Sequence, residues 1–142
     1  MEYNYQEKKV VLVLFEKVET GVALNICGHL SIALGALIEK GILGRLEHID
    51  ASGVKHNGIS KYPVIITKTK SGKLRSAINE ARKNPAITMI DYPQEMLVTG
   101  HDNELNSAIS GKEEDQFEYL GAIFYGESSE IANITGKFSL WK

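Results

Sequence analysis

A continuous apolar run near the N-terminus constrains the fold more than any other feature of the sequence. Residues 9–15 read Lys-Val-Val-Leu-Val-Leu-Phe, which is rich in β-branched side chains and lacks the polar alternation of a half-exposed strand. Such a run is typical of a strand that is buried on both faces, and burial on both faces requires helices above and below the sheet. The rest of the chain must therefore supply those helices.

The segment after this run predicts a helix of the same buried kind. A polar loop leads to Thr20, whose hydroxyl is suited to cap a helix, and residues 22–39 are apolar almost all the way round before Gly41. A helix without a polar face packs on more than one side.

Further strands and helices alternate along the chain, which predicts a layered α/β fold with a sheet of about four strands in a single domain, 1–142. A long loop or irregular hairpin is expected at 46–61. The predicted strands lie at 64–67, 87–90 and 119–125, and the predicted helices at 71–84, at 102–110 and from Ser128 or Ser129.

Composition and charge exclude several classes of protein. With 142 residues, 43% hydrophobic and 24% charged, the chain has the make-up of a globular domain and not of a disordered one. Its one cysteine, Cys27, allows no intrachain disulfide, and the run at 10–15 is too short for a signal-peptide core or a membrane span. We therefore expect a cytoplasmic protein without a membrane segment.

The charge is unevenly distributed. A net charge of −2 offers no electrostatic case for nucleic acid, yet residues 55–83 contain eight Lys or Arg and a single acid. Two interpretations stay open, a solvated face of a strand–helix unit and a site for a phosphorylated or otherwise anionic partner.

Asn25 and His29 form the first candidate site. They are four residues apart, so they are neighbours on one face of the predicted helix, and each needs a hydrogen-bond partner if it is buried. The helix start at Thr20 and Gly21 follows the first strand, where backbone N–H groups favour an anion. The functional interpretation is a small polar pocket formed by these four residues. The alternative is a core histidine bonded to a backbone carbonyl.

Thr99, Gly100, His101 and Asp102 form the second candidate site. Three polar groups beside a glycine that permits close approach are able to line a pocket mouth. The alternative is helix capping by Thr99 or Asp102, with His101 simply exposed.

The sequence lacks the motifs of a cysteine nucleophile, a metal site or a cofactor-binding site. Cys27 and His29 are two residues apart and point away from each other on a helix, so Cys27 is interpreted as a structural thiol. The set His48, Asp50 and His56 has no standard ligand spacing, and no phosphate loop, dinucleotide fingerprint or nucleophile elbow is present. We therefore expect neither a metal nor a cofactor.

The order of several short motifs resembles a known superfamily. A strand, Thr20-Gly21 and a helix centred on His29, together with the closing segment 126–140, are similar to peptidyl-tRNA hydrolase II. The chain resembles the domain-of-unknown-function 2000 family still more closely, over about residues 8–141. That second resemblance rests on the motifs Asn25-Ile-Cys-Gly-His29, Tyr62-Pro-Val-Ile65, Thr99-Gly-His-Asp102 and Gly136-Lys-Phe-Ser-Leu-Trp141. It implies three layers, α/β/α, with helices on both faces of a mixed four-stranded sheet.

The resemblance to the hydrolases is incomplete at their active site. Their catalytic lysine, seven positions before the histidine, is replaced by Val22, and their glutamine, three positions before it, is replaced by Ile26. Their aspartate after the third strand corresponds to Asp91. The resemblance thus implies His29 and Asp91 as catalytic candidates without a cationic partner, which argues against hydrolysis of peptidyl-tRNA.

Three functional hypotheses remain, and the sequence does not decide whether the protein is an enzyme. The first is a binding or regulatory module for a small anionic ligand. The second is a hydrolase of an ester or amide, such as peptidyl-tRNA, with His29 as general base, Asp91 as its orienter and Lys68 or Lys73 as a substitute cation. The third is a homodimeric interaction protein with an exposed apolar patch at Tyr62, Phe138 or Trp141.

Overall fold

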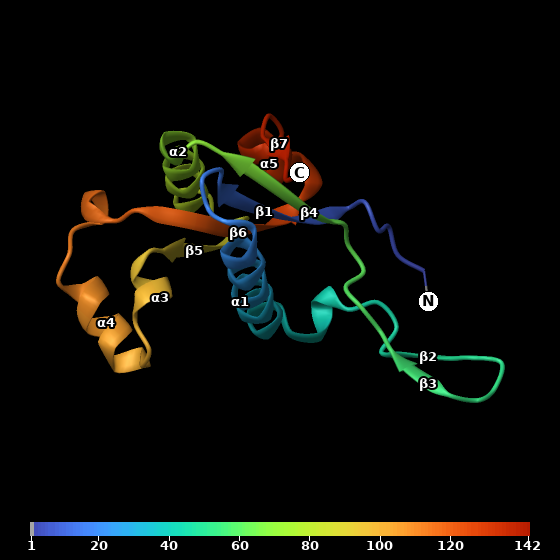
Figure 1. Ribbon diagram of the computed structural model, residues 1–142. Helices are drawn as coiled ribbons and strands as arrows, with labels where there is room; N and C mark the ends of the chain where they lie inside the picture. The colour runs from blue at the N-terminus through green and yellow to red at the C-terminus, as the bar shows by residue number, and fades with distance from the viewer. Residues whose placement is uncertain (1) are drawn as a thin grey trace.

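A mixed five-stranded sheet forms the centre of the computed structural model, which describes residues 2–142 (Figure 1). The strand order is β5-β6-β1-β4-β7, and β1 pairs in parallel with β4 and antiparallel with β6. The five strands are β1 (Lys8–Phe15), β4 (Val64–Thr69), β5 (Thr88–Pro93), β6 (Tyr119–Glu127) and β7 (Ser139–Leu140). The sheet thus has one strand more than predicted, because the closing tail adds the two-residue β7 to the edge of β4.

Helices cover both faces of this sheet (Figure 1). The long helix α1 (Thr20–Ile38), continued by the 3₁₀ turn η1 (Glu39–Ile42), covers one face. Helices α2 (Ser71–Arg82) and α5 (Ser128–Thr135) cover the other. Strand β1 contributes to both cores, since Leu12 and Leu14 pack with α1 while Val11 and Val13 pack with α2 and α5. The burial of this strand on both faces is therefore confirmed.

Two excursions leave this layered body. The first, between β5 and β6, contains α3 (Glu95–Val98), α4 (Asp102–Ser110) and the 3₁₀ turn η2 (Glu114–Gln116). The second is a hairpin of β2 (Glu47–Ile49) and β3 (Lys55–Asn57), which extends well away from the sheet (Figure 1). No residue of α4 is buried in the part of the chain that the structure describes, so α4 is weakly packed.

The predicted side-chain caps of the helices are wrong. Extended residues directly before α1, α2 and α4 occupy the cap positions, and no side-chain cap hydrogen bond forms at these three described helix starts. Thr20, Ser71 and Asp102 are each the first helical residue, one position too late to cap. The hydroxyl of Thr99 donates instead to the carbonyl of Glu95, 2.8 Å away, at the end of α3.

Helix α1 ends in a backbone conformation that an ordinary side chain disfavours. Glu39 has φ 56° and ψ −142°, close to a region populated almost solely by glycine. The regular helix therefore ends at its C-cap residue Glu39, two residues before Gly41, where the sequence predicts its end.

We expect Glu39→Gly to raise the free energy of unfolding by about 1 kcal/mol, because glycine adopts this conformation without steric cost. Urea denaturation monitored by circular dichroism measures the change. Ala36→Gly, three residues earlier in regular helix, is the matched control and should lower stability by about 1 kcal/mol. Loss of stability in both variants would contradict the assignment of strain to Glu39.

Candidate functional site

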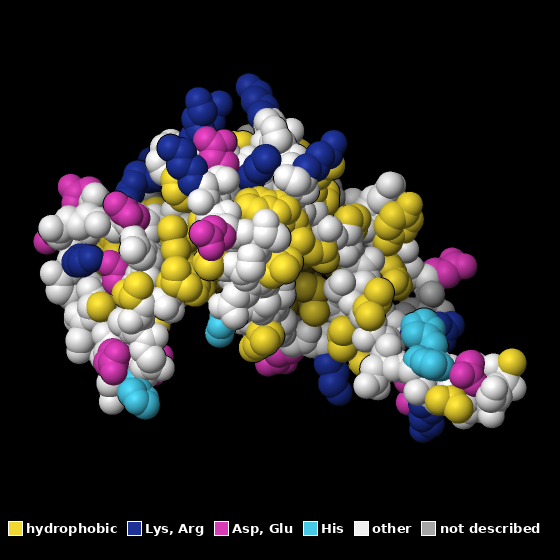
Figure 2. Space-filling model, in the orientation of Figure 1, with side chains coloured by type: hydrophobic (Ala, Val, Ile, Leu, Met, Phe, Trp, Pro, Cys, Tyr) yellow, Lys and Arg dark blue, Asp and Glu magenta, His cyan; other side chains and the backbone are white. Residues whose placement is uncertain are grey.

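A cavity of about 650 Å³ opens between α1 and the α3–α4 excursion. Its volume lies within the range of about 300–1,000 Å³ typical of small-molecule sites. Figure 2 shows the surface hollowed between α1 and the part of the molecule that carries α3 and α4. The cavity is lined by Asn25, His29, Leu30, Ala33, Ile90, Tyr92, Met96, Leu97, Thr99, Gly100, His101, Asp102 and Leu105.

Two regular elements form one side and the floor. Helix α1 presents Asn25 and His29 one turn apart, as their spacing predicts. Strand β5 presents Ile90 and Tyr92, which lie on the same face because side chains alternate along a strand.

The opposite wall is a short segment between α3 and α4. Its conformation is held by local hydrogen bonds, from Thr99 to the end of α3 and from the Gly100 N–H to the Glu104 carboxylate at 3.3 Å. Asp102 and Glu104 place negative charge in the first turn of α4, which complements the helix dipole there. The rim of the cavity is therefore acidic on the α4 side.

The structure brings most of the predicted ligand-binding residues to this one cavity. Asn25 and His29 line it together with all four residues of the segment 99–102, although the two groups are far apart in the sequence. Thr20 and Gly21 are exposed at the start of α1 and do not line it.

His29 is not a buried core histidine. Its side chain and that of Asn25 are exposed, and neither makes a hydrogen bond to any other residue within 2–142. Both side chains are therefore free to bind a ligand in the cavity.

Asp91 lies on the opposite face of the sheet from His29. Residues 90 and 92 point toward α1, so residue 91 points toward α2, where its carboxylate accepts a hydrogen bond from Arg82 at 2.5 Å. Arg82 also donates to the Tyr119 hydroxyl at 3.0 Å. Burial, the largest effect, raises the pKa of Asp91 even though the Arg82 cation opposes that rise. The structure thus does not bring Asp91 to His29, and the predicted pairing of the two is not formed.

The cavity of His29 also lacks a cation. Its lining contains no Lys or Arg from the described residues. Val22, in place of the hydrolase lysine, lines a smaller neighbouring cavity of about 250 Å³ together with Lys17. Lys68 lies elsewhere, 5.9 Å above the Trp141 ring, and Lys73 belongs to α2 on the other face.

Sequence reasoning missed two residues of this region, Tyr92 and Glu95. The predicted strand ends at residue 90, but Tyr92 continues β5, and the alternation with Ile90 is the signal that places it in the cavity. Burial raises the pKa of Tyr92, so its hydroxyl stays protonated and is available as a donor at neutral pH.

Glu95 ties the α3–α4 excursion to the chain that follows it. Its carboxylate pairs with the Lys112 ammonium at 2.5 Å, while its second oxygen, Oε1, is buried without a partner among residues 2–142. Burial raises the pKa of Glu95, but the bond from Lys112 and its own backbone lower it more, so the net shift is downward.

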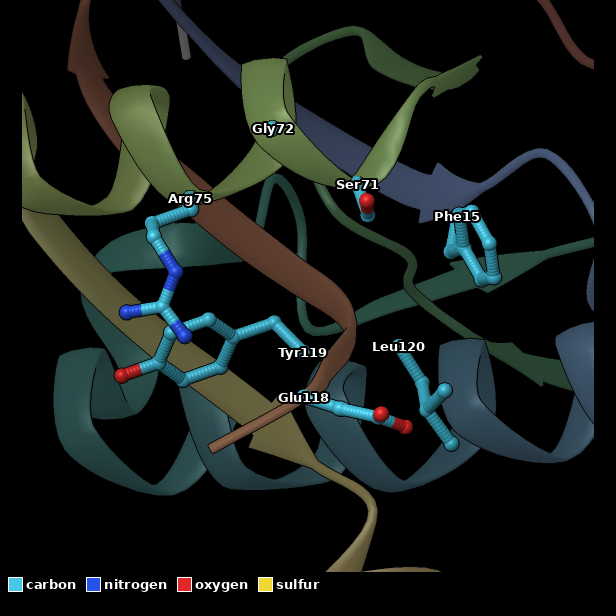
Figure 3. Close-up of a pocket in the computed structure, with 7 residues that line it drawn as sticks. All are labelled: Phe15, Ser71, Gly72, Arg75, Glu118, Tyr119 and Leu120. Atoms are coloured by element: carbon cyan, nitrogen blue, oxygen red, sulfur yellow. The ribbon is translucent and has the colours of Figure 1, made fainter. Parts of the chain in front are cut away.

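Another cavity, of about 270 Å³, lies on the α2 side (Figure 3). Figure 3 shows the Arg75 guanidinium against the Tyr119 ring, 5.0 Å from its centroid. Arg75 also donates to the Glu114 carboxylate and the Phe117 carbonyl, so its guanidinium is already paired within the protein. None of the predicted site residues lines this cavity.

The basic segment 55–83 is spread over several elements. Three of its cations are in ion pairs, Lys55 with Glu47, Arg75 with Glu114, and Arg82 with Asp91. Figure 2 shows Lys and Arg side chains along the upper edge of the molecule.

Comparison with known proteins places the chain in a family. Residues 8–142 match the family described as Protein of unknown function (DUF2000). The chain belongs to the DUF2000 family. No curated protein matches the DUF2000 chain.

A solved structure has the same fold as this DUF2000 protein. It is a protein of unknown function, Atu0240, from Agrobacterium tumefaciens strain C58. The TM-score is 0.83 at 23% sequence identity, over 96% of this chain and 98% of the other. The likeness at this identity shows a shared fold, and it carries no function with it.

We expect Lys112→Met to destabilise the protein by about 1 kcal/mol at pH 7, a value discounted because the lysine is partly exposed. The loss arises because the buried Glu95 carboxylate would remain without its counter-ion. Since the folded pKa of Glu95 is lowered, the pair stabilises the fold above the unfolded pKa of about 4.3 and loses that effect as the pH falls through the folded value.

The difference from the unsubstituted protein should therefore shrink in acid, as measured by urea denaturation across the range below about pH 5. Lys83→Met, at an exposed lysine that forms no ion pair within 2–142, is the control and should be nearly neutral. A penalty for Lys112→Met that is equal at all pH values would contradict the role of Glu95.

Proposed function

We propose that this protein is a binding module for a small organic molecule with an anionic, hydrogen-bond-accepting head group. The observation that carries the proposal is the meeting of Asn25 and His29 with the segment 99–102 around one cavity of about 650 Å³. Ligand sites of this size combine an apolar lining with a few converging polar groups.

The chemistry of the lining suggests the polarity of the ligand. Asn25, His29 and the protonated Tyr92 offer hydrogen-bond donors on the α1 and β5 sides, whereas Asp102 makes the α4 rim acidic. A carboxylate would therefore bind on the α1 side, away from Asp102. The remaining lining contains five aliphatic side chains and Met96, which suits a short apolar body.

We also propose that the fold is that of the peptidyl-tRNA hydrolase II superfamily, with its hydrolytic chemistry lost. The order of the elements and of the motifs around His29 supports the relationship. The valine at position 22 and the absence of Lys and Arg from the described lining of the His29 cavity argue against retained hydrolysis.

We expect a short-chain carboxylate such as hexanoate to raise the thermal midpoint of the protein, while hexylamine and hexanol, matched in chain length, do not. Ligand at 100 times its Kd stabilises a fold by about 2.7 kcal/mol, which a thermal-shift assay detects. The shift should be lost in Asn25→Ala and His29→Ala.

Leu37→Ala is the matched control, because Leu37 is exposed on the same helix and does not line the cavity. Equal stabilisation by the amine, or a shift that survives in both cavity variants, would rule out this binding mode.

A hydrolase remains a second candidate, because the exposed imidazole of His29 faces a cavity and has no partner among residues 2–142. Hydrolysis of peptidyl-tRNA or of an aminoacyl ester that is abolished in a folded His29→Ala variant would select it. We expect no hydrolysis above background, since a general base without an electrophilic group gives a weak catalyst.

A further inference from the structure

The outer face of α1 is apolar and uncovered. Its inner face packs on the sheet through four buried residues, Ala23, Ile26, Leu30 and Leu34. On the outer face Leu24 is 64% exposed and Ile32 is 75% exposed. No charged residue lies between Glu19 and Glu39, so this face has none of the groups that keep a surface helix in water.

Glycines and large aliphatic side chains on this outer face are placed symmetrically about Gly28. Leu24 and Ile32 lie four residues before and after it, and Gly21 and Gly35 lie seven residues before and after it. On a helix all five residues fall within about 40° of Gly28, so they form one stripe about 21 Å long. We call these five residues the palindromic stripe.

The glycines of the palindromic stripe are open to the outside. A Cβ atom added at Gly21, Gly28 or Gly35 would meet no other atom within 4 Å. The fold of a single copy therefore does not require glycine at these positions. A second helix that approaches closely does require small residues along its path.

We infer that the palindromic stripe is the docking surface for a second copy of this chain, with the two α1 helices antiparallel and a two-fold axis at Gly28. In an isologous contact each surface must complement itself, and a symmetric sequence achieves this. Each large side chain meets a hole formed by residues i, i+3, i+4 and i+7 of the other helix. Leu24 enters the hole of Gly28, Ser31, Ile32 and Gly35, and Ile32 enters the hole of Gly21, Leu24, Asn25 and Gly28.

The position of the β2–β3 hairpin also favours a second copy of this chain as the partner. It leaves the body beyond the C-terminal end of α1 (Figure 1), which is the end that the N-terminal half of an antiparallel partner helix would reach. Together, α1 and the hairpin region contain seven of the fourteen large exposed hydrophobic side chains in the described chain. Those of the hairpin region are Leu46, Ile49, Val54 and Ile59.

The patch expected at Tyr62, Phe138 or Trp141 does not provide an alternative interface. Tyr62 is only 8% exposed, and the other two are half-buried against the two cores. The uncovered apolar surface lies on α1 and the hairpin instead.

A second copy on this stripe would also reach the ligand cavity. Asn25 belongs both to the hole that receives the partner's Ile32 and to the lining of the cavity. The partner would therefore form part of the wall beside Asn25. This inference does not depend on the proposed ligand, because none of the five residues of the palindromic stripe lines the cavity.

The experiment is sedimentation equilibrium of the full chain, with two matched substitutions. Leu24 and Leu37 are the same residue type, lie on the same helix and are both 64% exposed, but Leu37 lies outside the palindromic stripe. We expect a dimer for the unsubstituted chain and for Leu37→Gln. Leu24→Gln should raise the dissociation constant at least about tenfold. A monomeric unsubstituted chain at about 100 μM, or equal effects of the two substitutions, would overturn the inference.

A second variant separates association from folding. Gly28→Leu adds a side chain into open space in the single copy and removes a helix-weakening glycine, so the fold should be retained by circular dichroism. At the two-fold axis the added side chains would collide, and the dimer should dissociate. A dimer that persists in folded Gly28→Leu overturns the inference.

The antiparallel register is tested by cysteine pairing in a Cys27→Ala background. Gly21→Cys and Gly35→Cys chains should form a disulfide-linked species when mixed and oxidised, and neither should do so alone. Cross-linking of Gly21→Cys with itself indicates parallel helices and overturns the register.

A membrane is the competing occupant of this face, since residues 20–42 are long and apolar enough to cross a bilayer by length and composition. Flotation of the chain with phosphatidylcholine vesicles, lost in Leu24→Gln, would assign the stripe to lipid and overturn the dimer. We expect no flotation.

Discussion

The burial of β1 on both faces is the constraint on which the rest of the structure depends. Its alternating side chains hold α1 on one side of the sheet and α2 with α5 on the other. Each of the two cores contains aliphatic side chains that are withdrawn almost completely from water, among them Leu14 in one and Val13 in the other. A polar residue at any of the five buried positions of this strand, 10–14, would disturb the core on the face that it enters, so both layers of helices depend on this strand.

The alternation of side chains along β5 likewise decides which residues of this strand face the candidate site. It sends Ile90 and Tyr92 to the cavity beside His29, and it sends Asp91 to Arg82 on the far face. His29 therefore forms no hydrogen bond with Asp91, and the described lining of its cavity contains no Lys or Arg. The lining of the cavity by Ile90 and Tyr92 and the separation of Asp91 from His29 thus have one geometric cause.

The spacing of apolar and polar residues along the sequence predicted those features that depend only on regular helices and strands. The double burial of β1, the helix of Asn25 and His29, and the order of layers all follow from side-chain spacing. Contacts between distant segments were not predictable in this way, because nothing in the local pattern marks the β7 pairing or the Glu95–Lys112 ion pair. The caps failed for a different reason: Thr20 has the right chemistry but lies one residue inside the helix.

A single copy of the chain leaves the outer apolar face of helix α1 uncovered. A helix that is apolar all round is predicted to pack on more than one side, yet in one copy only its inner side is covered. Glycine within a helix costs about 0.5–1 kcal/mol relative to alanine, and nothing in the fold of one copy requires glycine at positions 21, 28 or 35. Close approach of another helix is the situation in which a missing side chain becomes an advantage. The symmetry of the stripe about Gly28 makes an identical helix the partner that fits it on both sides of a two-fold axis.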